Sequence, residues 1–273
     1  SLVEHQVKPN LAGLDFIGLT PSQRRVYYSE QPGLAVPQGR HYFEPTDGTT
    51  PIGQKRDLWN GLRISYTAGN VPSENAAQTT ANTTINSMLT LKSVVPEGGT
   101  LFEFVMGDNF HSDPLAISSP SNSTYFRQDA GSRLATLCTD DVNDDDRRYT
   151  RFALKQERRR RMLALGTNEG ALHFFDIGFF RTDTDPTKAG KFTNGTGDEL
   201  MAFIPRQVMP QIMSLYDPTA TEPEYTVDGK TVATDALIDP IHAGYGSGSP
   251  PTACDRRWRT VLLGGLREGG ARA

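Results

Sequence analysis

The chain has 273 residues, of which 36% are hydrophobic, and a formal net charge of −4. This length allows one or two domains with a buried core, and the acidic balance excludes a global positive field that would recruit nucleic acid. The 26 Gly and 18 Pro favour short strands joined by many turns over helical bundles. No apolar run approaches the roughly 18 residues of a membrane-spanning helix.

Residues 1–99 predict an irregular, β-rich lead-in segment. Short apolar stretches at 24–28 and 57–66 stand between turns rich in Pro and Gly and have the composition of short strands. Residues 70–87 are rich in Asn, Thr and Ser, which is typical of an exposed loop. Residues 89–95 begin with a period of two, which predicts a half-buried strand.

Strand patterns recur more regularly in residues 100–273. We expect strands at 101–106, 114–118, 162–165, 171–175, 200–204, 232–234 and 260–263. Residues 205–215 alone carry a convincing helical pattern, with Val208, Ile212 and Leu215 on one face. The connections at 119–149, 177–197 and 235–257 are long, and such loops are commonly functional.

Two of these strands predict a β-hairpin. Residues 162–165 and 171–175 flank Gly-Thr-Asn-Glu-Gly, whose glycines can adopt the positive φ of a tight turn. A further strand at 200–204 ends at Pro205, and this succession is the order of strands in one blade of a β-propeller. The residues expected to be buried between blades are Leu163, Leu165, Leu172, Phe174, Phe203, Val261 and Leu263.

Four motifs follow one another along the chain, at residues 107–114, 166–176, 225–229 and 258–265. In this order they resemble the propeller of the PilC/PilY type IV pilus tip adhesins, over about residues 100–270. The residues that carry the resemblance are Gly107, Asp108, His111, Ser112, Pro114, Gly166, Asn168, Gly170, Leu172, His173, Asp176, Asp228, Gly229, Trp258, Arg259, Thr260, Gly264 and Gly265.

The resemblance implies an all-β fold, in which residues 100–273 form the opening blades of a quinoprotein-like β-propeller with long loops, preceded by the β-rich segment 1–99. It implies a non-catalytic protein that acts in pilus assembly or priming, in twitching motility and in surface adhesion. The implied partners are minor pilins of the tip complex, a host or abiotic surface, and the remainder of the same propeller. The implied location is extracellular, at the pilus tip or outer surface of a Gram-negative bacterium.

A quinoprotein-like β-propeller oxidoreductase is the alternative function. Quinoproteins share the blade pattern Ala-x-Asp-x-x-x-Gly-x-x-x-Trp, but here Phe174 takes the Ala position and Ala202 falls at or near the Trp position. No quinone site is evident in the sequence. A structural extracellular β-repeat protein is a third possibility.

His111 and His173 lie within the motifs and suggest a metal or catalytic pair. No Cys/His spacing matches a zinc site, so we favour histidines that satisfy buried backbone groups. No cofactor is predicted, apart from the calcium alternative below.

The acidic run at 140–146 spaces Asp141, Asn143 and Asp145 as in the first half of an EF-hand loop. Asp146 stands where that loop requires Gly, and Phe152 where it requires Glu. We favour a solvated acidic loop, with weak calcium binding as the alternative. We likewise interpret the basic run at 158–161 as a solvated loop partly neutralised by this acidic neighbour.

The two cysteines, Cys138 and Cys254, lie 116 positions apart. In an exported protein they could form a disulfide that contributes on the order of 4 kcal/mol in the chain-entropy model. Two buried free thiols are the alternative. The chain opens on Ser1 rather than Met, so we expect a processed product or a piece of a longer protein.

Overall fold

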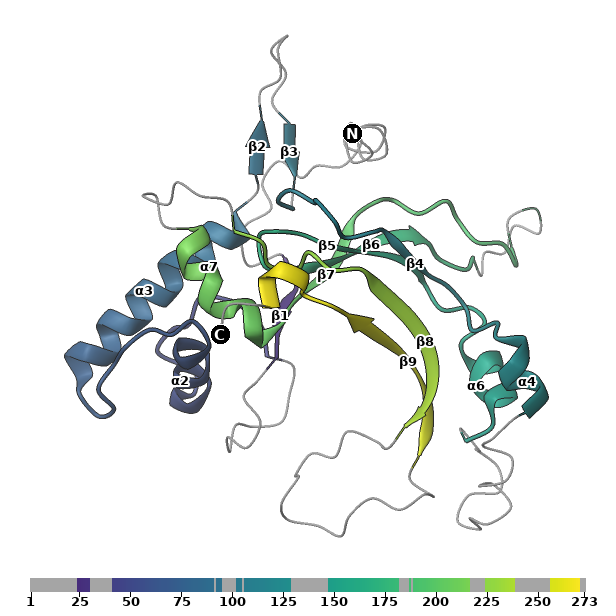
Figure 1. Cartoon of the computed structure of the whole chain (residues 1–273), viewed down its shortest axis with the longest axis horizontal. Coiled ribbons are helices and arrows are strands. Elements are labelled where there is room, and N and C mark those ends of the chain that lie inside the picture. The colour runs from purple at the N-terminus through teal and green to yellow at the C-terminus, as the bar shows by residue number, and fades with distance from the viewer. Residues whose placement is uncertain are drawn as a thin grey trace.

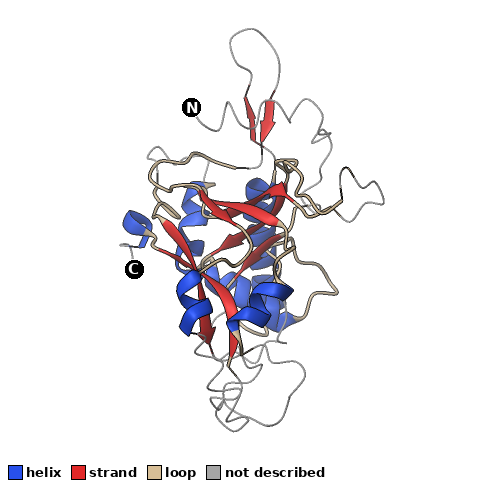
Figure 2. Ribbon diagram, turned by 90° about the vertical axis from the view of Figure 1, so that its right-hand side faces the viewer, coloured by secondary structure: helices blue, strands red, loops and turns tan. Residues whose placement is uncertain are grey.

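The computed structural model describes residues 24–29, 41–90, 92–94, 102–104, 106–128, 147–181, 187, 189–216, 224–238 and 256–270. These residues form an open five-stranded sheet, two antiparallel strand pairs and a set of helices (Figure 1). Helices and strands alternate along the chain and pack together (Figure 2). The architecture is therefore mixed α/β, and the prediction of an all-β fold is wrong.

The five-stranded sheet has the order β1-β7-β6-β5-β4. Its strands are β1 (Val26–Tyr28), β4 (Leu115–Ile117), β5 (Arg161–Gly166), β6 (Leu172–Gly178) and β7 (Glu199–Ile204). Strands β4 to β7 are antiparallel neighbours in chain order, whereas β1 lies parallel to β7. Four antiparallel strands in this order match the arrangement of one propeller blade, but the described strands do not close into a propeller.

The predicted hairpin at the centre of this sheet is confirmed. Strand β5 pairs with β6 so that Leu165 lies opposite His173 and Gly166 opposite Leu172. The turn ends at Gly170, whose φ of 103° lies in the region that glycine tolerates and other residues avoid. The local pattern of apolar runs around a glycine turn was therefore sufficient to predict this element.

The remaining strands form two separate pairs. One joins β2 (Lys92–Val94) to β3 (Phe102–Phe104), and the other joins β8 (Thr231–Ile238) to β9 (Arg257–Gly264). The β8–β9 ladder extends further at both ends than the strands predicted at 232–234 and 260–263.

The helical elements lie at two ends of the sheet. They are α2 (Ile52–Gly61), α3 (Val71–Leu89), α4 (Ser123–Gln128), α6 (Tyr149–Lys155), α7 (Met209–Leu215) and the 3-10 turns η2 (Arg206–Val208) and η4 (Arg267–Gly270). The helix predicted at 205–215 is confirmed as η2 followed by α7. Figure 1 shows α2, α3 and α7 gathered beside β1, with α4 and α6 at the opposite end.

Most of residues 52–89 lies in two helices, which contradicts the β-rich lead-in. Helix α2 covers the first half of the predicted strand at 57–66, because Leu58, Trp59 and Leu62 share one buried side at helical spacing. Helix α3 occupies the predicted loop at 70–87. Its hydroxyl side chains, such as Thr79 and Thr83, donate to backbone carbonyls four residues earlier and so do not compete with the helix.

Helix α3 carries its own start signals and a narrow buried stripe. The Asn70 side chain accepts a hydrogen bond of 3.1 Å from the Ser73 backbone N–H, which caps the first turn. Pro72 stands at the first turn, where its missing N–H is tolerated. The buried stripe consists of Ala77, Ala81, Ile85 and Met88.

We expect Asn70→Ala to lower the free energy of unfolding by about 1 kcal/mol, because it removes this cap. Asn75→Ala is the matched control, since Asn75 is exposed within the same helix and Ala has the higher helix propensity. Urea denaturation of both variants measures the difference. Equal stabilities for the two variants would contradict the capping role.

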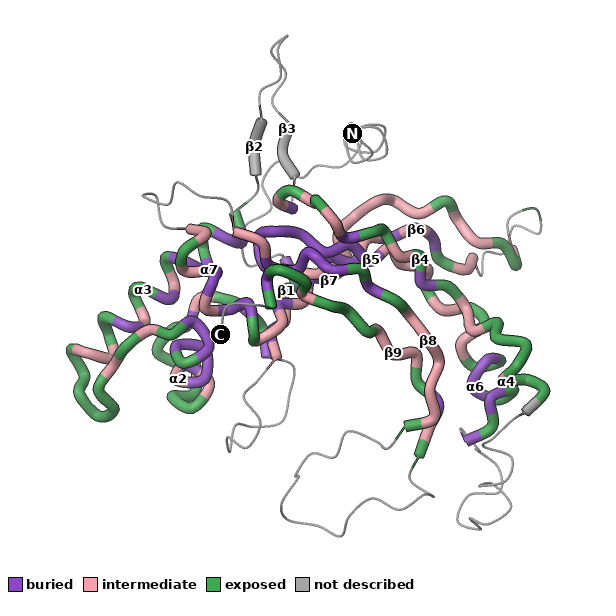
Figure 3. Tube along the Cα trace, in the orientation of Figure 1, coloured by how far each residue is buried: buried purple, intermediate pink, exposed green. Residues whose placement is uncertain are grey.

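The main hydrophobic core lies between one face of the sheet and the helices α2, α3 and α7. It joins Tyr28 and Ile204 of the sheet to Trp59, Ile85 and Ile212 of the helices. Figure 3 shows the buried positions concentrated in these central strands and on the inner sides of the helices. A second cluster, centred on Ile117, Ala164 and Phe174, lies on the other face, where Ala233 and Leu262 of the β8–β9 ladder pack against it.

The prediction that seven apolar strand residues are largely buried is only partly right. Leu165 and Phe174 are buried, whereas Leu163, Leu172, Phe203 and Val261 are half-buried and Leu263 is exposed. The reason is that helices cover one face of the sheet, while a two-stranded ladder covers the other face incompletely. Truncation of Phe203 should therefore cost less than the roughly 3–5 kcal/mol of a fully enclosed Phe.

Candidate functional site

The first two motifs interlock at the β5–β6 turn. The Gly166 N–H donates to Ser112 Oγ at 3.0 Å, and Asn109 Nδ2 donates to the Gly166 carbonyl at 2.8 Å. Asn168 donates twice to Asp108, from its backbone N–H to the carbonyl at 3.0 Å and from Nδ2 to Oδ2 at 3.1 Å. These hydrogen bonds hold residues of the first motif against the β5–β6 turn, although the two segments are more than fifty positions apart in the chain. We call this meeting point of the motifs the motif junction.

The third motif completes the junction from another side. The fully buried carboxylate of Asp228 accepts from the His111 backbone N–H at 3.0 Å and lies 2.6 Å from His111 Nδ1. Thr226 Oγ1 donates to the Thr167 carbonyl at 3.0 Å. The His111 ring therefore pairs with the carboxylate of Asp228, and the His111 backbone N–H donates to the same carboxylate. This differs from the prediction that the ring satisfies a buried backbone group.

Glycine is required where the third motif meets the second and the fourth. A Cβ at Gly166 would overlap the carbonyl oxygen of Val227, and a Cβ at Gly229 would overlap that of Gly265. Gly107 is also close-packed, since its Cβ would lie 3.0 Å from Glu169 Cβ. Gly166 and Gly229 are therefore sites of close backbone approach.

A buried row of alternating charges runs from the junction to helix α3. His173 is fully buried, with Nε2 2.8 Å from Glu169 Oε1 and Nδ1 2.7 Å from Glu199 Oε1. Arg24 donates to both carboxylate oxygens of Glu199, at 2.9 and 3.0 Å, and to the Met88 carbonyl at the end of α3. A cation at a helix C-terminus is favoured by the helix dipole. We call Glu169, His173, Glu199 and Arg24 the buried charge row.

The protonation states of this row follow from its contacts. Burial alone lowers the pKa of His173, but the hydrogen bonds to Glu169 and Glu199 outweigh it and raise the pKa above the usual 6.5. Burial alone raises the pKa of Glu199, but His173 and Arg24 outweigh it and lower the pKa from 4.5 to about 2. Glu199 is therefore ionised at neutral pH, and its contacts favour the positively charged form of His173.

These shifts predict a pH window for stability. The contribution of His173 is fully present below pH 6.5 and is lost as the pH rises through its raised pKa. The contribution of Glu199 is present above pH 4.5 and is lost as the pH falls towards about 2. The contribution of the buried charge row should therefore be greatest between these limits. Urea denaturation across pH 3–9 should show a stability difference between wild type and His173→Gln that declines on both sides.

The remaining motif residues lie in or beside the five-stranded sheet and the β8–β9 ladder. Asp176 is buried and accepts from Arg160 Nε at 3.0 Å and from the Gly178 N–H at 3.1 Å. Trp258 donates from Nε1 to the Arg147 carbonyl at 2.8 Å and packs edge-to-face against Tyr149. Pro114, Arg259, Gly264 and Gly265 are exposed, and Gly170 and Leu172 lie at the β5–β6 turn.

The basic run at 158–161 has exposed Arg side chains, as expected of a solvated loop, and these side chains also make specific contacts. Arg160 pairs with Asp176, and Arg161 lies 3.7 Å above the centroid of the Phe192 ring. Arg158 lies similarly over Phe180, at 4.9 Å. These cation–π contacts and the ion pair engage the guanidinium groups that a nucleic-acid-binding surface would direct towards phosphates.

Two groups of predicted site residues lie outside the described residues: Cys138 with Cys254, and Asp141 with Asn143 and Asp145. Their disulfide and calcium predictions stay predictions. Within the part of the chain that the structure describes, no group of three or more His, Cys, Asp or Glu side chains is arranged to hold a metal ion.

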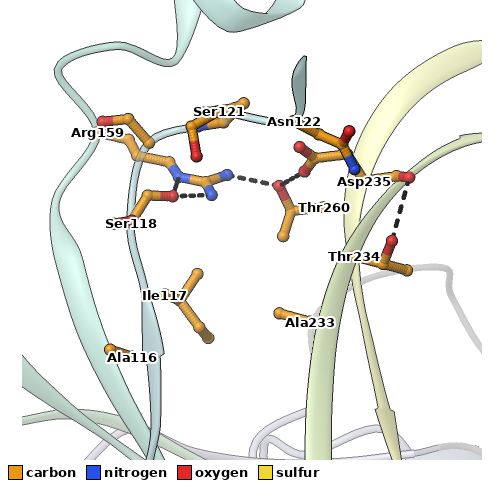
Figure 4. A pocket seen from close by; sticks show the side chains of 12 residues that line it. Ala116, Ile117, Ser118, Ser121, Asn122, Arg159, Ala233, Thr234, Asp235 and Thr260 are labelled. Atoms are coloured by element: carbon orange, nitrogen blue, oxygen red, sulfur yellow. Dashed lines mark hydrogen bonds between the residues drawn. The ribbon is translucent and has the colours of Figure 1, made fainter. Parts of the chain in front are cut away.

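A polar pocket of about 310 Å³ opens between the chain after β4 and the β8–β9 ladder (Figure 4). Arg159 spans it, donating from its guanidinium to the Ser118 carbonyl and to Thr260 Oγ1, the latter at 2.6 Å. Thr260 in turn donates to Asp235 Oδ1 at 2.7 Å. The motif residue Thr260 of β9 thus connects Arg159 to Asp235 of β8. These contacts fix the position of the Arg159 guanidinium.

A second pocket, of about 290 Å³, opens at the motif junction itself. Asp108 and Asn168 of the interlocked motifs line it, together with Glu169 of the buried charge row. We call it the junction pocket. The sequence motifs predicted Asp108 and Asn168, but Arg24, Glu169 and Glu199 were missed as functional or structural candidates. Glu169 and Glu199 stand within or beside the motifs, whereas Arg24 carries no local signal.

Close packing at glycines and buried hydrogen bonds hold the motifs of this open sheet together. Such an arrangement is a structural scaffold that presents loops and pockets. No described helix is both long enough and apolar enough to cross a membrane. No protein-family model matches the chain, and no solved structure matches it.

The sequence is similar to curated proteins of the type IV pilus system. The type IV pilus biogenesis factor PilY1 homolog of Xylella fastidiosa (strain Temecula1) is 27% identical over 166 residues, which cover 61% of this chain and 10% of that protein. The type IV pilus biogenesis factor PilY1 of Pseudomonas aeruginosa strains PAO1 and PAK is 28% identical over 170 residues, with the same shares of each chain. These matches confirm the predicted relationship to the PilC/PilY family. The chain spans about a tenth of the length of these relatives.

Proposed function

We propose that this protein acts in type IV pilus biogenesis, at the pilus tip or outer cell surface, as an assembly and adhesion component without catalytic turnover. The observation that carries the proposal is the similarity to PilY1 proteins over 61% of the chain. Its first three motifs meet in the motif junction, where their side chains make structural hydrogen bonds, and the fourth motif approaches the third at Gly265. A rigid scaffold with connected loops is suited to binding partners such as minor pilins or a surface.

We further propose that β4 to β7 form one blade of a β-propeller and that β8–β9 belongs to the next. The antiparallel order of β4 to β7 supports this. On the ladder, Val232 and Leu263 lie opposite each other and are 46% and 58% exposed, which leaves an apolar pair for a further blade to cover. A structure of the full-length protein tests this: a ring of sheets is expected, and an isolated open sheet would contradict the proposal.

Deletion of the gene in its native host tests the pilus function. We expect fewer surface pili by electron microscopy, smaller twitching zones and weaker surface attachment than in the parent. Complementation with the intact gene should restore all three. Normal piliation, twitching and attachment in the deletion strain would refute the pilus role and direct attention to the quinoprotein-like alternative.

A further inference from the structure

The polar pocket between the chain after β4 and the β8–β9 ladder, which we call the ladder pocket, is electrically balanced. Arg159 and Asp235 are the charged residues of its described lining, and the other lining residues are uncharged. The Thr260 hydroxyl links the two, at 2.6 Å from Arg159 and 2.7 Å from Asp235. One cation and one anion held this close leave little net field, so the pocket favours a neutral polar ligand over an ion.

The two charged groups keep unused hydrogen-bonding capacity. Arg159 has five N–H donors, and its contacts with Ser118 and Thr260 use three of them, which leaves two. Asp235 accepts from Thr260 at Oδ1 and from Tyr149 at Oδ2, both at 2.7 Å, so each carboxylate oxygen keeps a second lone pair. A ligand in the pocket therefore meets N–H donors and a carboxylate acceptor close together.

Amide and hydroxyl groups line the rest of the polar side. Asn122 Oδ1 accepts from the backbone N–H groups of Thr124 and Tyr125, at 3.0 and 3.4 Å, so the other side-chain atom of Asn122 is the amide nitrogen Nδ2. This nitrogen makes no hydrogen bond within the described residues. Ser121 and Thr234 add hydroxyls, which can donate and accept. The lining therefore matches a ligand that carries several groups able to do both.

Another part of the lining is small and apolar. It consists of Ala116, Ile117 and Ala233. Figure 4 shows the side chains of Ile117 and Ala233 pointing into the same space below the contact between Arg159 and Thr260. A pyranose ring has the same mixed character, because its hydroxyls project around the ring while its C–H groups form apolar patches. The volume of about 310 Å³ lies at the lower end for ligand pockets and matches one such ring.

We propose that the ladder pocket binds one pyranose unit of a neutral saccharide. Neighbouring ring hydroxyls accept from Arg159 and donate to Asp235, a further hydroxyl accepts from Asn122 Nδ2, and the C–H face of the ring lies against the apolar part of the lining. Thr260 is a positioning residue, since its hydroxyl holds the guanidinium beside the carboxylate before the ligand arrives. As the ligand of an adhesion component, the saccharide rests on the proposed function.

An extended peptide is a poorer fit, although the pocket lies between two strand edges. Strand β4 is the last strand of the described five-stranded sheet, and β8 belongs to a two-stranded one. A peptide that adds to such an edge needs free backbone groups along it. The Ser118 carbonyl already accepts from Arg159, and the Asn122 N–H donates to the Tyr149 hydroxyl at 3.1 Å. Peptide binding is therefore an outcome that would overturn the proposal.

The test is saturation-transfer NMR on the purified full-length protein with a panel of neutral probes, the methyl pyranosides of glucose, galactose, mannose and N-acetylglucosamine. We expect saturable binding of at least one probe, with a dissociation constant on the order of 1 mM. Cyclohexanol has a similar ring but a single hydroxyl, and it should bind at least about tenfold more weakly than that probe. Failure of every pyranoside to bind saturably, or tighter binding of cyclohexanol or of N-acetyl-tetraalanine amide, would overturn the proposal.

Variants localise the binding of the tightest pyranoside. Arg159→Lys keeps the charge but loses the planar fork, and it should weaken binding about five- to tenfold. Asn122→Asp keeps the Oδ1 acceptor for the first turn of α4 but removes the amide donors, and it should weaken binding about threefold or more. Arg158→Lys is the matched control, since Arg158 is exposed and does not line the pocket.

Wild-type affinity in Asn122→Asp together with folded Arg159→Lys would overturn the proposal. Asn122 is exposed, so Asn122→Asp tests the site even where Arg159→Lys does not fold, and wild-type affinity in Asn122→Asp then overturns it alone. The binding is measured on purified protein and independently of any pilus phenotype. The saccharide site can therefore fail while the proposed function holds, and the reverse is equally visible.

Discussion

Gly229→Ala is expected to lower the free energy of unfolding by about 3 kcal/mol or more, because its Cβ would overlap the backbone carbonyl of Gly265. Neither backbone can move freely. Gly229 precedes β8 and follows Asp228, which is bonded to His111, while Gly265 directly follows β9. Relief of the overlap would separate the third and fourth motifs at the motif junction.

Gly265→Ala is the matched control for this contact. A Cβ at Gly265 would meet nothing within 4 Å, although the same two residues are involved. We expect its unfolding free energy to lie within about 0.5 kcal/mol of wild type. Urea denaturation measures both variants, and a Gly229→Ala protein as stable as Gly265→Ala would show that the motifs do not pack closely. In the native host, only Gly229→Ala should reduce piliation.

His173→Gln is expected to cost about 3–5 kcal/mol, because it leaves the buried carboxylates of Glu169 and Glu199 without their shared cation. Breaking a buried ion pair by removal of one partner is more costly than replacing the whole group, since the remaining charges stay desolvated. Arg24 still pairs with Glu199, so most of the destabilisation comes from the buried carboxylate of Glu169.

His111→Gln provides the comparison. His111 also pairs with a buried carboxylate, that of Asp228, but its side chain is 31% exposed, so water replaces part of the lost contact. We expect a loss of about 1 kcal/mol. Chemical denaturation at pH 5.5 measures both variants. A loss for His173→Gln no larger than that for His111→Gln would contradict the stabilising role of the buried charge row.

The comparison between sequence and structure is most informative at helix α3. Its Asn- and Thr-rich composition predicted a loop, although the capping Asn70 and the proline of the first turn were both visible. Its buried stripe begins with Ala77 and Ala81, whose small side chains give only a weak hydrophobic period. The helix is stabilised by packing of this stripe in the main core, which is a tertiary contribution that local propensity does not contain.

The motif residues illustrate a second limit. The sequence identified Asp108, His111 and Asp228 as motif residues, but it did not indicate their partners, because His111 and Asp228 are 117 positions apart. Arg24 and Glu199 are 175 positions apart and were missed as a pair. Hydrogen bonds between distant segments depend on how the chain folds back on itself, and a single sequence does not record that.

The sequence by itself determined the β5–β6 hairpin, the strands beside it, the α7 helix and the family relationship, because each depends on a local period, a turn or an ordered motif. Only the tertiary structure decided that residues 52–61 and 71–89 are helical and that the fold is mixed α/β. It also decided that the first three motifs meet at one junction, and which of their carboxylates are buried beside histidine or line a pocket. Burial and long-range pairing arise only when segments far apart in the chain pack together, and the packed core then overrides the weak local preferences of its helices.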